Sequence, residues 1–191
     1  MKIKNLTIAI FFIITHLCSG IIYAEEDGSS LIAKSKYFSV YGHRGLDIQT
    51  FLGKLDMNYF LQPDSVLDNA GPGEKDILAK TLDSIFLEVS DVLDIHIYSF
   101  EGNIEVLPDK ASVNDVYRKY FNADFQERSF YLTNTNTIYI SLDDVTLGMI
   151  GHEMSHAIIS RYFVVPPPSK IQEVLCGYVE FRLRKLTNTL D

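Results

Sequence analysis

Two stretches of the chain repeat apolar residues at three- and four-residue intervals, the spacing of an amphipathic helix. Residues 74–93 do so from Leu78 to Leu93, and residues 169–186 do so from Ile171 to Leu183. This spacing puts the apolar side chains on one stripe of a helix. The pattern predicts two long helices that pack by one face, with weaker helical patterns at residues 46–61 and 113–120.

Aromatic and β-branched residues gather in short runs, which predict strands at residues 37–41, 95–100, 129–133 and 137–141. Asn134, Thr135 and Asn136 separate the last two runs, as expected for a hairpin. Residues 25–34 are polar, and we expect them to be loose. The chain is therefore predicted to be an α+β protein with a small mixed or antiparallel sheet.

A third helix is predicted at residues 143–162, and it carries the most informative residues. Ser141 stands three residues before Asp144, a spacing that resembles a capping box, and Pro166 to Pro168 end the helical pattern. We expect this helix and the C-terminal helix to pack against the sheet.

The sequence His152-Glu153-Met154-Ser155-His156 lies inside this predicted helix and follows the H-E-x-x-H pattern. Residues four apart share one helix face, about 5 to 6 Å from each other. Both imidazoles can therefore bind one Zn²⁺, while Glu153 is placed to act as a general base on a water molecule.

A catalytic zinc usually has three protein ligands, so a third must come from elsewhere. Glu173 is our first candidate, because it begins the helix that follows the prolines. Glu180 shares its face and stays an alternative, although it is also spaced to pair with Arg184. His43 and His96 are further alternatives. Gly177, on the same stripe, would let the two helices approach closely at the metal.

These residues resemble the gluzincin metallopeptidases, of which this chain would be a very small member. The resemblance rests on His152, Glu153 and His156, with Glu173 inside the segment Lys-Ile-Gln-Glu-Val-Leu-Cys-Gly-Tyr. It implies a zincin-like fold, one Zn²⁺ bound by His152, His156 and Glu173, and Glu153 as the catalytic base. The chain departs from the family at Gly177, where some members have a carboxylate that supports a metal-binding histidine.

The expected function is hydrolysis of a peptide or protein substrate by a zinc-dependent enzyme. An extended substrate would pair with residues 137–141 if that strand forms the sheet edge. Tyr139, Tyr162 and Tyr178 are candidate donors to the oxyanion, although each also suits ordinary packing. The alternative is a zinc- or peptide-binding module without catalysis, or a latent peptidase. No pattern selects an oligomeric state.

The N-terminal residues 1–24 are predicted to be a signal peptide. Lys2 and Lys4 precede an apolar run at residues 6–14, and Ala24 offers a small residue for cleavage. An uncleaved anchor and acylation of Cys18 are the alternatives. We expect a single domain at residues 25–191, secreted or periplasmic.

The net charge restricts the classes of binding partner, and the cysteine content restricts the possible disulfides. The net charge is -8, and cleavage would remove Lys2 and Lys4, which changes -8 to -10. This acidity argues against nucleic acid and against stable membrane association. The mature part would keep one cysteine, Cys176, which therefore has no intramolecular disulfide partner. Its apolar segment favours a buried structural thiol over a nucleophile.

Overall fold

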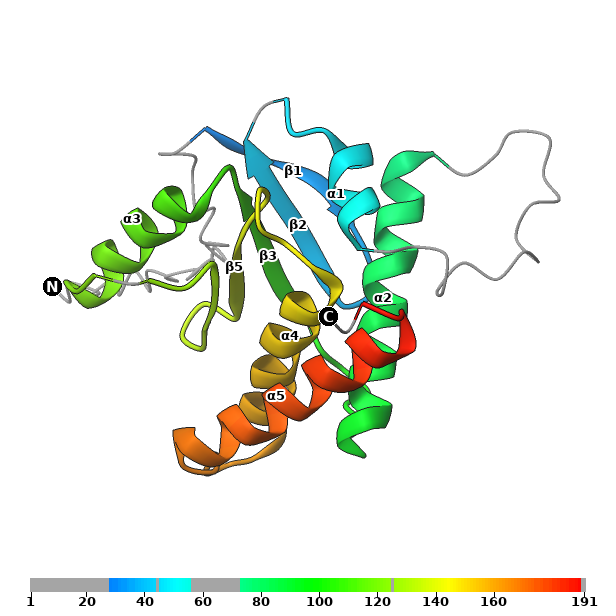
Figure 1. The fold of residues 1–191 in the computed structure, drawn as a ribbon, viewed down its shortest axis with the longest axis vertical. Helices are drawn as coiled ribbons and strands as arrows, with labels where there is room; N and C mark the ends of the chain where they lie inside the picture. Colours follow the sequence, from blue (N-terminus) through cyan, green and yellow to red (C-terminus); the bar gives the residue numbers. More distant parts are fainter. Residues whose placement is uncertain (1–27, 44, 56–72, 125, 190–191) are drawn as a thin grey trace, which may run out of the picture.

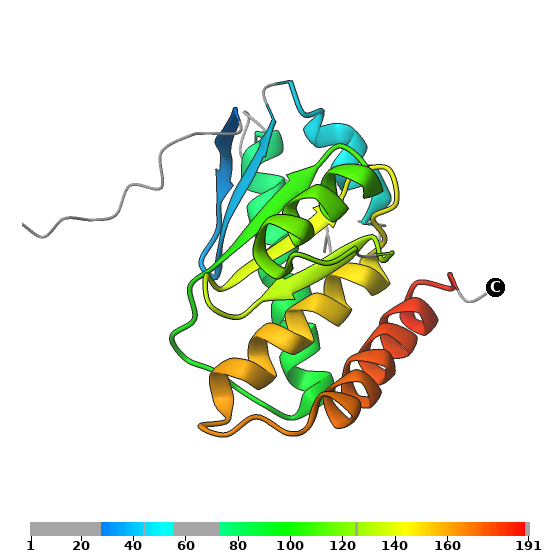
Figure 2. The same cartoon turned by 90° about the vertical axis from the view of Figure 1, so that its left-hand side faces the viewer.

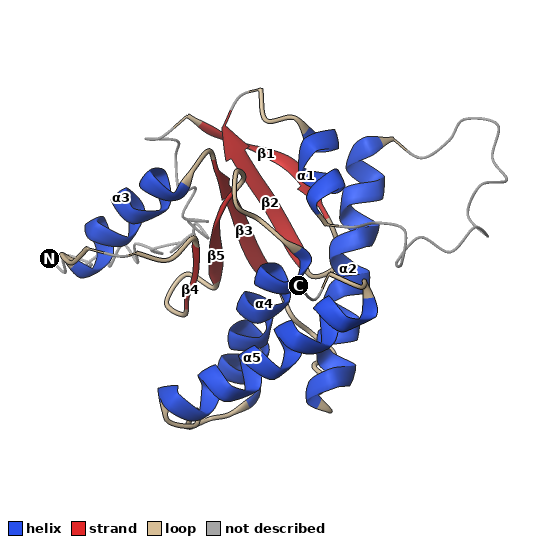
Figure 3. Cartoon of the chain, viewed as in Figure 1, coloured by secondary structure: helices blue, strands red, loops and turns tan. Residues whose placement is uncertain are grey.

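The computed structural model describes residues 28–43, 45–55, 73–124 and 126–189. These residues form a mixed sheet of five strands with five helices, so the predicted α+β class is confirmed (Figure 1, Figure 3). The predicted signal peptide lies outside the described residues. Among those described, no helix is long and apolar enough to cross a membrane. The elements in chain order are β1 (Ser29–Lys34), β2 (Phe38–His43), α1 (Ile48–Lys54), α2 (Glu74–Leu93), β3 (Gly102–Leu107), α3 (Lys110–Phe121), β4 (Ser129–Leu132), β5 (Thr137–Ser141), α4 (Leu147–Tyr162) and α5 (Ser169–Leu186).

The strands lie in the order β1-β2-β3-β5-β4. The two outer pairs are antiparallel, and β3 runs parallel to both β2 and β5. The predicted hairpin is confirmed as β4 and β5. However, β5 lies inside the sheet and β4 forms the edge, so the expectation that residues 137–141 are an edge strand is wrong.

The helices cover the two faces of the sheet unequally. Helices α2 and α4 pack on one face in the main core, which includes Ile104, Ile138 and Met154. Helix α3 packs on the other face over a smaller cluster around Val113 and Phe130. Helix α5 packs on α4 and α2 and lies on the outside of the molecule (Figure 2).

Four predicted segments need correction or trimming. Residues 29–34 are not loose, because β1 pairs with β2. Residues 95–100 connect α2 to β3 and are not a strand, because Asp94 ends α2 in the left-handed conformation and Phe100 then stacks on Phe86 in the core. The strand predicted at residues 37–41 corresponds to β2, which spans Phe38–His43. Of the predicted helix at 46–61, α1 is present, and residues 56–61 lie outside the described residues.

Helix α4 begins four residues later than predicted. Its N-cap is Thr146, whose hydroxyl accepts a hydrogen bond from the Met149 amide. Ser141 instead donates to Asp144 at 2.7 Å within the preceding turn. The pair Ser141 and Asp144, which resembled a capping box in the sequence, therefore belongs to the turn before α4. The helix starts after Thr146, whose side chain satisfies one of the free amide groups of the first turn.

Candidate metal centre

Helix α4 presents His152 and His156 side by side on the face that meets α5. Their ring centroids are 5.1 Å apart, and the ring planes differ by 60°. Both side chains are partly buried. The two histidines therefore share one helix face, as their four-residue spacing predicts, because α4 is regular through the whole motif.

Glu173, in the first turn of α5, brings its carboxylate to both imidazoles. Its Oε1 lies 3.3 Å from His156 Nε2, and its Oε2 lies 3.4 Å from His152 Nε2. The side chain is 58 % exposed, so solvent reaches the same place. The carboxylate thus bridges the two imidazoles, with one oxygen beside each Nε2 atom.

Glu180 approaches a different atom of the same site. Its Oε2 lies 3.3 Å from His152 Nδ1, whereas Glu173 lies beside the other ring nitrogen, Nε2. The hydrogen bond from His152 lowers the pKa of Glu180 despite partial burial, and Arg184 contributes less. Glu180 is therefore placed to orient His152 instead of sharing its Nε2 side.

The two imidazoles differ in their readiness to take a proton. Burial lowers the pKa of His152, but the hydrogen bond to Glu180 and the charges of three nearby carboxylates outweigh burial, so its pKa is raised. For His156 burial prevails and its pKa is lowered, although the negative charge of Glu173 opposes this. His156 is thus neutral and able to bind a metal at lower pH than His152.

Glu153 is buried beside this cluster, with only 6 % of its surface exposed. Burial raises its pKa to about 7, while a hydrogen bond from Ser129 partly opposes the rise. The Ser129 hydroxyl donates to Oε1 at 2.7 Å, across from α4 on the first residue of β4. A carboxyl group with a pKa near neutrality is suited to taking and returning a proton.

A cavity of about 740 Å³ opens between the edge strand β4 and the helices α4 and α5. Its walls hold both histidines and all three glutamates of the site. Ser129, Phe130 and Tyr131 line it from β4, although the Phe130 side chain also packs in the smaller cluster on the opposite face of the sheet. Polar residues also contribute: Lys110, Gln126, Arg128, Ser160 and Gln172.

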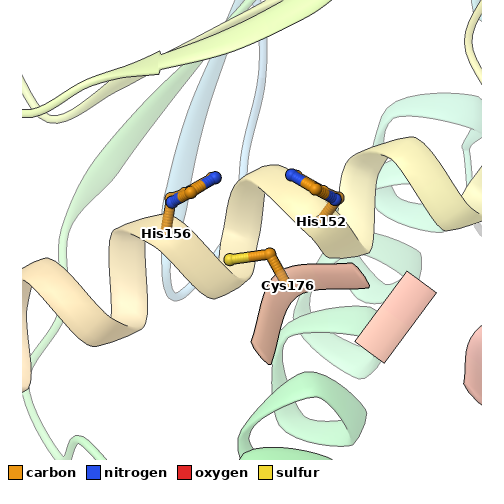
Figure 4. A group of neighbouring side chains, drawn as sticks. All are labelled: His152, His156 and Cys176. Atoms are coloured by element: carbon orange, nitrogen blue, oxygen red, sulfur yellow. The ribbon is translucent and has the colours of Figure 1, made fainter. Parts of the chain in front are cut away.

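Cys176 is the other potential metal ligand near the histidines. One ligand atom from each of His152, His156 and Cys176 lies within 4.8 Å of the others, and Figure 4 shows the thiol reaching toward the imidazoles from α5. The thiol is buried, which raises its pKa strongly. The site therefore offers two candidates for a third ligand: the solvent-exposed Glu173 carboxylate, which lies 3.3 and 3.4 Å from the two Nε2 atoms, and the Cys176 thiol, which burial keeps in its neutral form.

Other residues considered from the sequence lie elsewhere. His43 ends β2 and His96 lies 3.8 Å from Asp91; neither lines the cavity. The three candidate tyrosines do not line it either. The Tyr139 hydroxyl faces Tyr120 on the α3 side of the sheet, the Tyr178 hydroxyl accepts from Arg182, and Tyr162 is exposed.

The close approach of the two helices depends on glycines of α4 and not on Gly177. A Cβ atom at Gly177 would meet nothing within 4 Å, so the predicted role of that glycine is wrong. A Cβ at Gly151 would lie 2.0 Å from Leu183 Cδ1, and one at Gly148 would lie 3.0 Å from Glu180 Cγ. These glycines let α5 come near enough for its glutamates to reach the histidines.

Ser129, Tyr131 and Gln172 were not identified as site residues from the sequence. A signal existed for the first two, because alternation along a strand puts both on the face opposite Phe130. That signal becomes useful only once β4 is known to border the cavity. No protein-family model matches the chain, and searches of curated proteins and of solved structures gave no match either.

Proposed function

We propose that this protein is a zinc-dependent peptidase in which His152, His156 and Glu173 bind the metal. The observation that carries the proposal is the position of the Glu173 carboxylate, 3.3 and 3.4 Å from the Nε2 atoms of the two histidines. Two imidazole nitrogens and one carboxylate oxygen form a donor set typical of catalytic zinc. Bound there, Zn²⁺ would acidify a water molecule and polarise a carbonyl group.

Glu153 is the residue we propose as general base. It borders the cavity without joining the ion pairs that Glu173 makes with the histidines, and Ser129 fixes one of its oxygens. The other oxygen is available to take a proton from water. Glu153 would then return this proton to the leaving nitrogen of the peptide.

The substrate we propose is an extended peptide. Among the described strands, β4 is the sheet edge beside the cavity, and its backbone can pair with an added strand. Residues 137–141 were expected to hold the substrate only if they formed the sheet edge, and that condition is not met. Main-chain pairing tolerates many side chains, so we expect broad sequence tolerance.

A specific observation supports a second candidate function, zinc binding without catalysis. If Cys176 bound the metal together with both histidines and Glu173, four protein ligands would leave no position for water. Closed sites of this kind are structural. The two functions differ in whether the site, once loaded with zinc, hydrolyses peptides.

The test compares the wild-type protein with Glu153→Gln on a library of unstructured peptides, both loaded with zinc. We expect the variant to keep its zinc and fold and to lose hydrolysis by at least about 100-fold. Glu101→Gln, at an exposed position, is the matched control and should cleave like the wild type. Equal cleavage by wild type and Glu153→Gln would refute the role of Glu153, and a zinc-loaded wild type that cleaves nothing would favour the binding function.

A further inference from the structure

The solvent-facing side of α5 is unusually apolar. Cys176, Val179 and Leu183 form its buried side, against α4. On the opposite side, four large apolar residues recur at three- and four-residue intervals and are each about half exposed or more: Ile171, Val174, Tyr178 and Phe181. A helix that packed only by its buried side would be expected to be polar on this side.

The charges on this outer side of α5 are all positive. Lys170, Arg182 and Lys185 are exposed between or beside the apolar residues. The two acidic residues of the helix, Glu173 and Glu180, turn instead toward the histidines. A chain with a net charge of -8 therefore presents here one face that is apolar and cationic.

The loop before α5 adds two more apolar side chains. Val164 is 100 % exposed and Val165 is 82 % exposed. Three prolines separate them from the helix and restrict the loop backbone. Two adjacent valines held in water have an unfavourable environment that burial in another apolar medium would relieve.

We propose that the outer side of α5, together with Val164 and Val165, docks on a bilayer that contains anionic phospholipid. The apolar side chains would enter the headgroup boundary, while the three cations contact lipid phosphates. Charge complementarity is what identifies the partner. The acidic remainder of the protein is repelled by such a membrane, so only this face can approach it and the orientation is fixed. The sequence-based argument against membranes used the net charge of the whole chain, which does not reveal that the positive charges gather on this one face.

The test is co-sedimentation with vesicles of phosphatidylcholine alone or mixed with phosphatidylglycerol. The full chain is expressed with its own N-terminal segment, and all variants are purified in the form that the host produces. We expect binding to the mixed vesicles to exceed binding to phosphatidylcholine, and to weaken with added salt. The double variant Val174→Asp with Phe181→Asp should lower the affinity for mixed vesicles at least about tenfold. Lys170→Gln with Lys185→Gln should lower it about fivefold per cation removed.

Leu87→Asp is the matched control, because Leu87 is also a half-exposed apolar residue on the outside of a helix, α2. It should bind vesicles like the wild type. Circular dichroism and zinc content, measured on every variant, show that α5 is still folded in place. Equal binding by wild type and the Val174/Phe181 variant would overturn the proposal. So would a concentration-dependent dimer in light scattering that the same variant disrupts, because the face would then bind a second copy.

Discussion

The hydroxyl of Ser129 donates a hydrogen bond to Oε1 of Glu153 at 2.7 Å, although 24 positions separate the two residues. Ser129 begins the edge strand and Glu153 lies on α4, so this bond joins the two sides of the cavity. The bond holds Oε1 of Glu153 in place, while the other carboxylate oxygen is available to water. We conclude that Ser129 positions the proposed base.

Loss of this hydroxyl should impair catalysis more than substrate binding. Ser129→Ala leaves one oxygen of Glu153 without its donor, so we expect kcat to fall about tenfold with little change in KM. Ser129→Thr keeps the hydroxyl and should restore most of the rate. A similar loss in both variants, or a change confined to KM, would contradict a positioning role.

The two glutamates of α5 should contribute unequally to zinc affinity. Glu173→Gln weakens a ligand beside both Nε2 atoms, whereas Glu180→Gln only weakens the orientation of His152 through Nδ1. Loss of an orienting carboxylate usually costs about 10- to 100-fold in metal affinity. We therefore expect a larger loss for Glu173→Gln than for Glu180→Gln in competition with a zinc chelator. The reverse order would assign the ligand role to Glu180.

Cys176 is predicted to be dispensable for zinc binding. Its thiol is buried against α4, and burial raises its pKa. Cys176→Ala should keep one zinc per chain and lose about 1 kcal/mol of unfolding free energy from poorer packing. In the cobalt-substituted wild type, absorption spectroscopy should show no intense thiolate-to-metal band. Such a band, with loss of metal in Cys176→Ala, would support the closed structural site.

Stability of the metal-free protein should depend on the ionisation of Glu153. Burial raises its pKa from 4.5 to about 7, so between these values the folded chain holds a proton that the unfolded chain has released. The free energy of unfolding therefore falls as the pH rises through this window. The Gln side chain of Glu153→Gln cannot ionise. Between pH 5 and pH 8 the free energy of unfolding should therefore fall less in this variant than in the wild type, by on the order of 1 to 3 kcal/mol.

Chemical denaturation with a chelator present, at several pH values, measures this difference. The histidines titrate in both proteins, so their contribution largely cancels in the comparison. Parallel pH profiles for wild type and variant would show that Glu153 has an ordinary pKa in the folded chain.

The sequence predicts the long helices well because their signal is local. The apolar stripes of residues 74–93 and 169–186 have the observed bounds of α2 and α5. The signal is weaker for the edge strand β1, although the other edge strand, β4, was predicted from its aromatic and β-branched residues. In β1 only Ala33 is buried, so no alternation marks it. Apolar residues buried in a connection, such as Ile95 and Phe100, resemble a strand because composition does not distinguish the two.

The residues of the site also fall into those with a local sequence signal and those whose place depends on tertiary packing. His152, Glu153 and His156 were identified because one helix turn holds all three. The position of Ser129 depends on which strand borders α4, and sequence patterns do not give strand order. Glu173 and Glu180 share a helix face, and only the packing of α5 on Gly148 and Gly151 determines which carboxylate reaches which nitrogen.

The zinc content of the purified protein tests the central proposal most directly. The wild type, metal-depleted and then dialysed against zinc, should hold one zinc per chain by elemental analysis, because two imidazoles and a carboxylate converge. His156→Ala should hold almost none, and the exposed-site control His96→Ala should hold as much as the wild type. A folded wild type that takes up no zinc, or a His156→Ala variant that still holds one, would contradict the proposed metal centre.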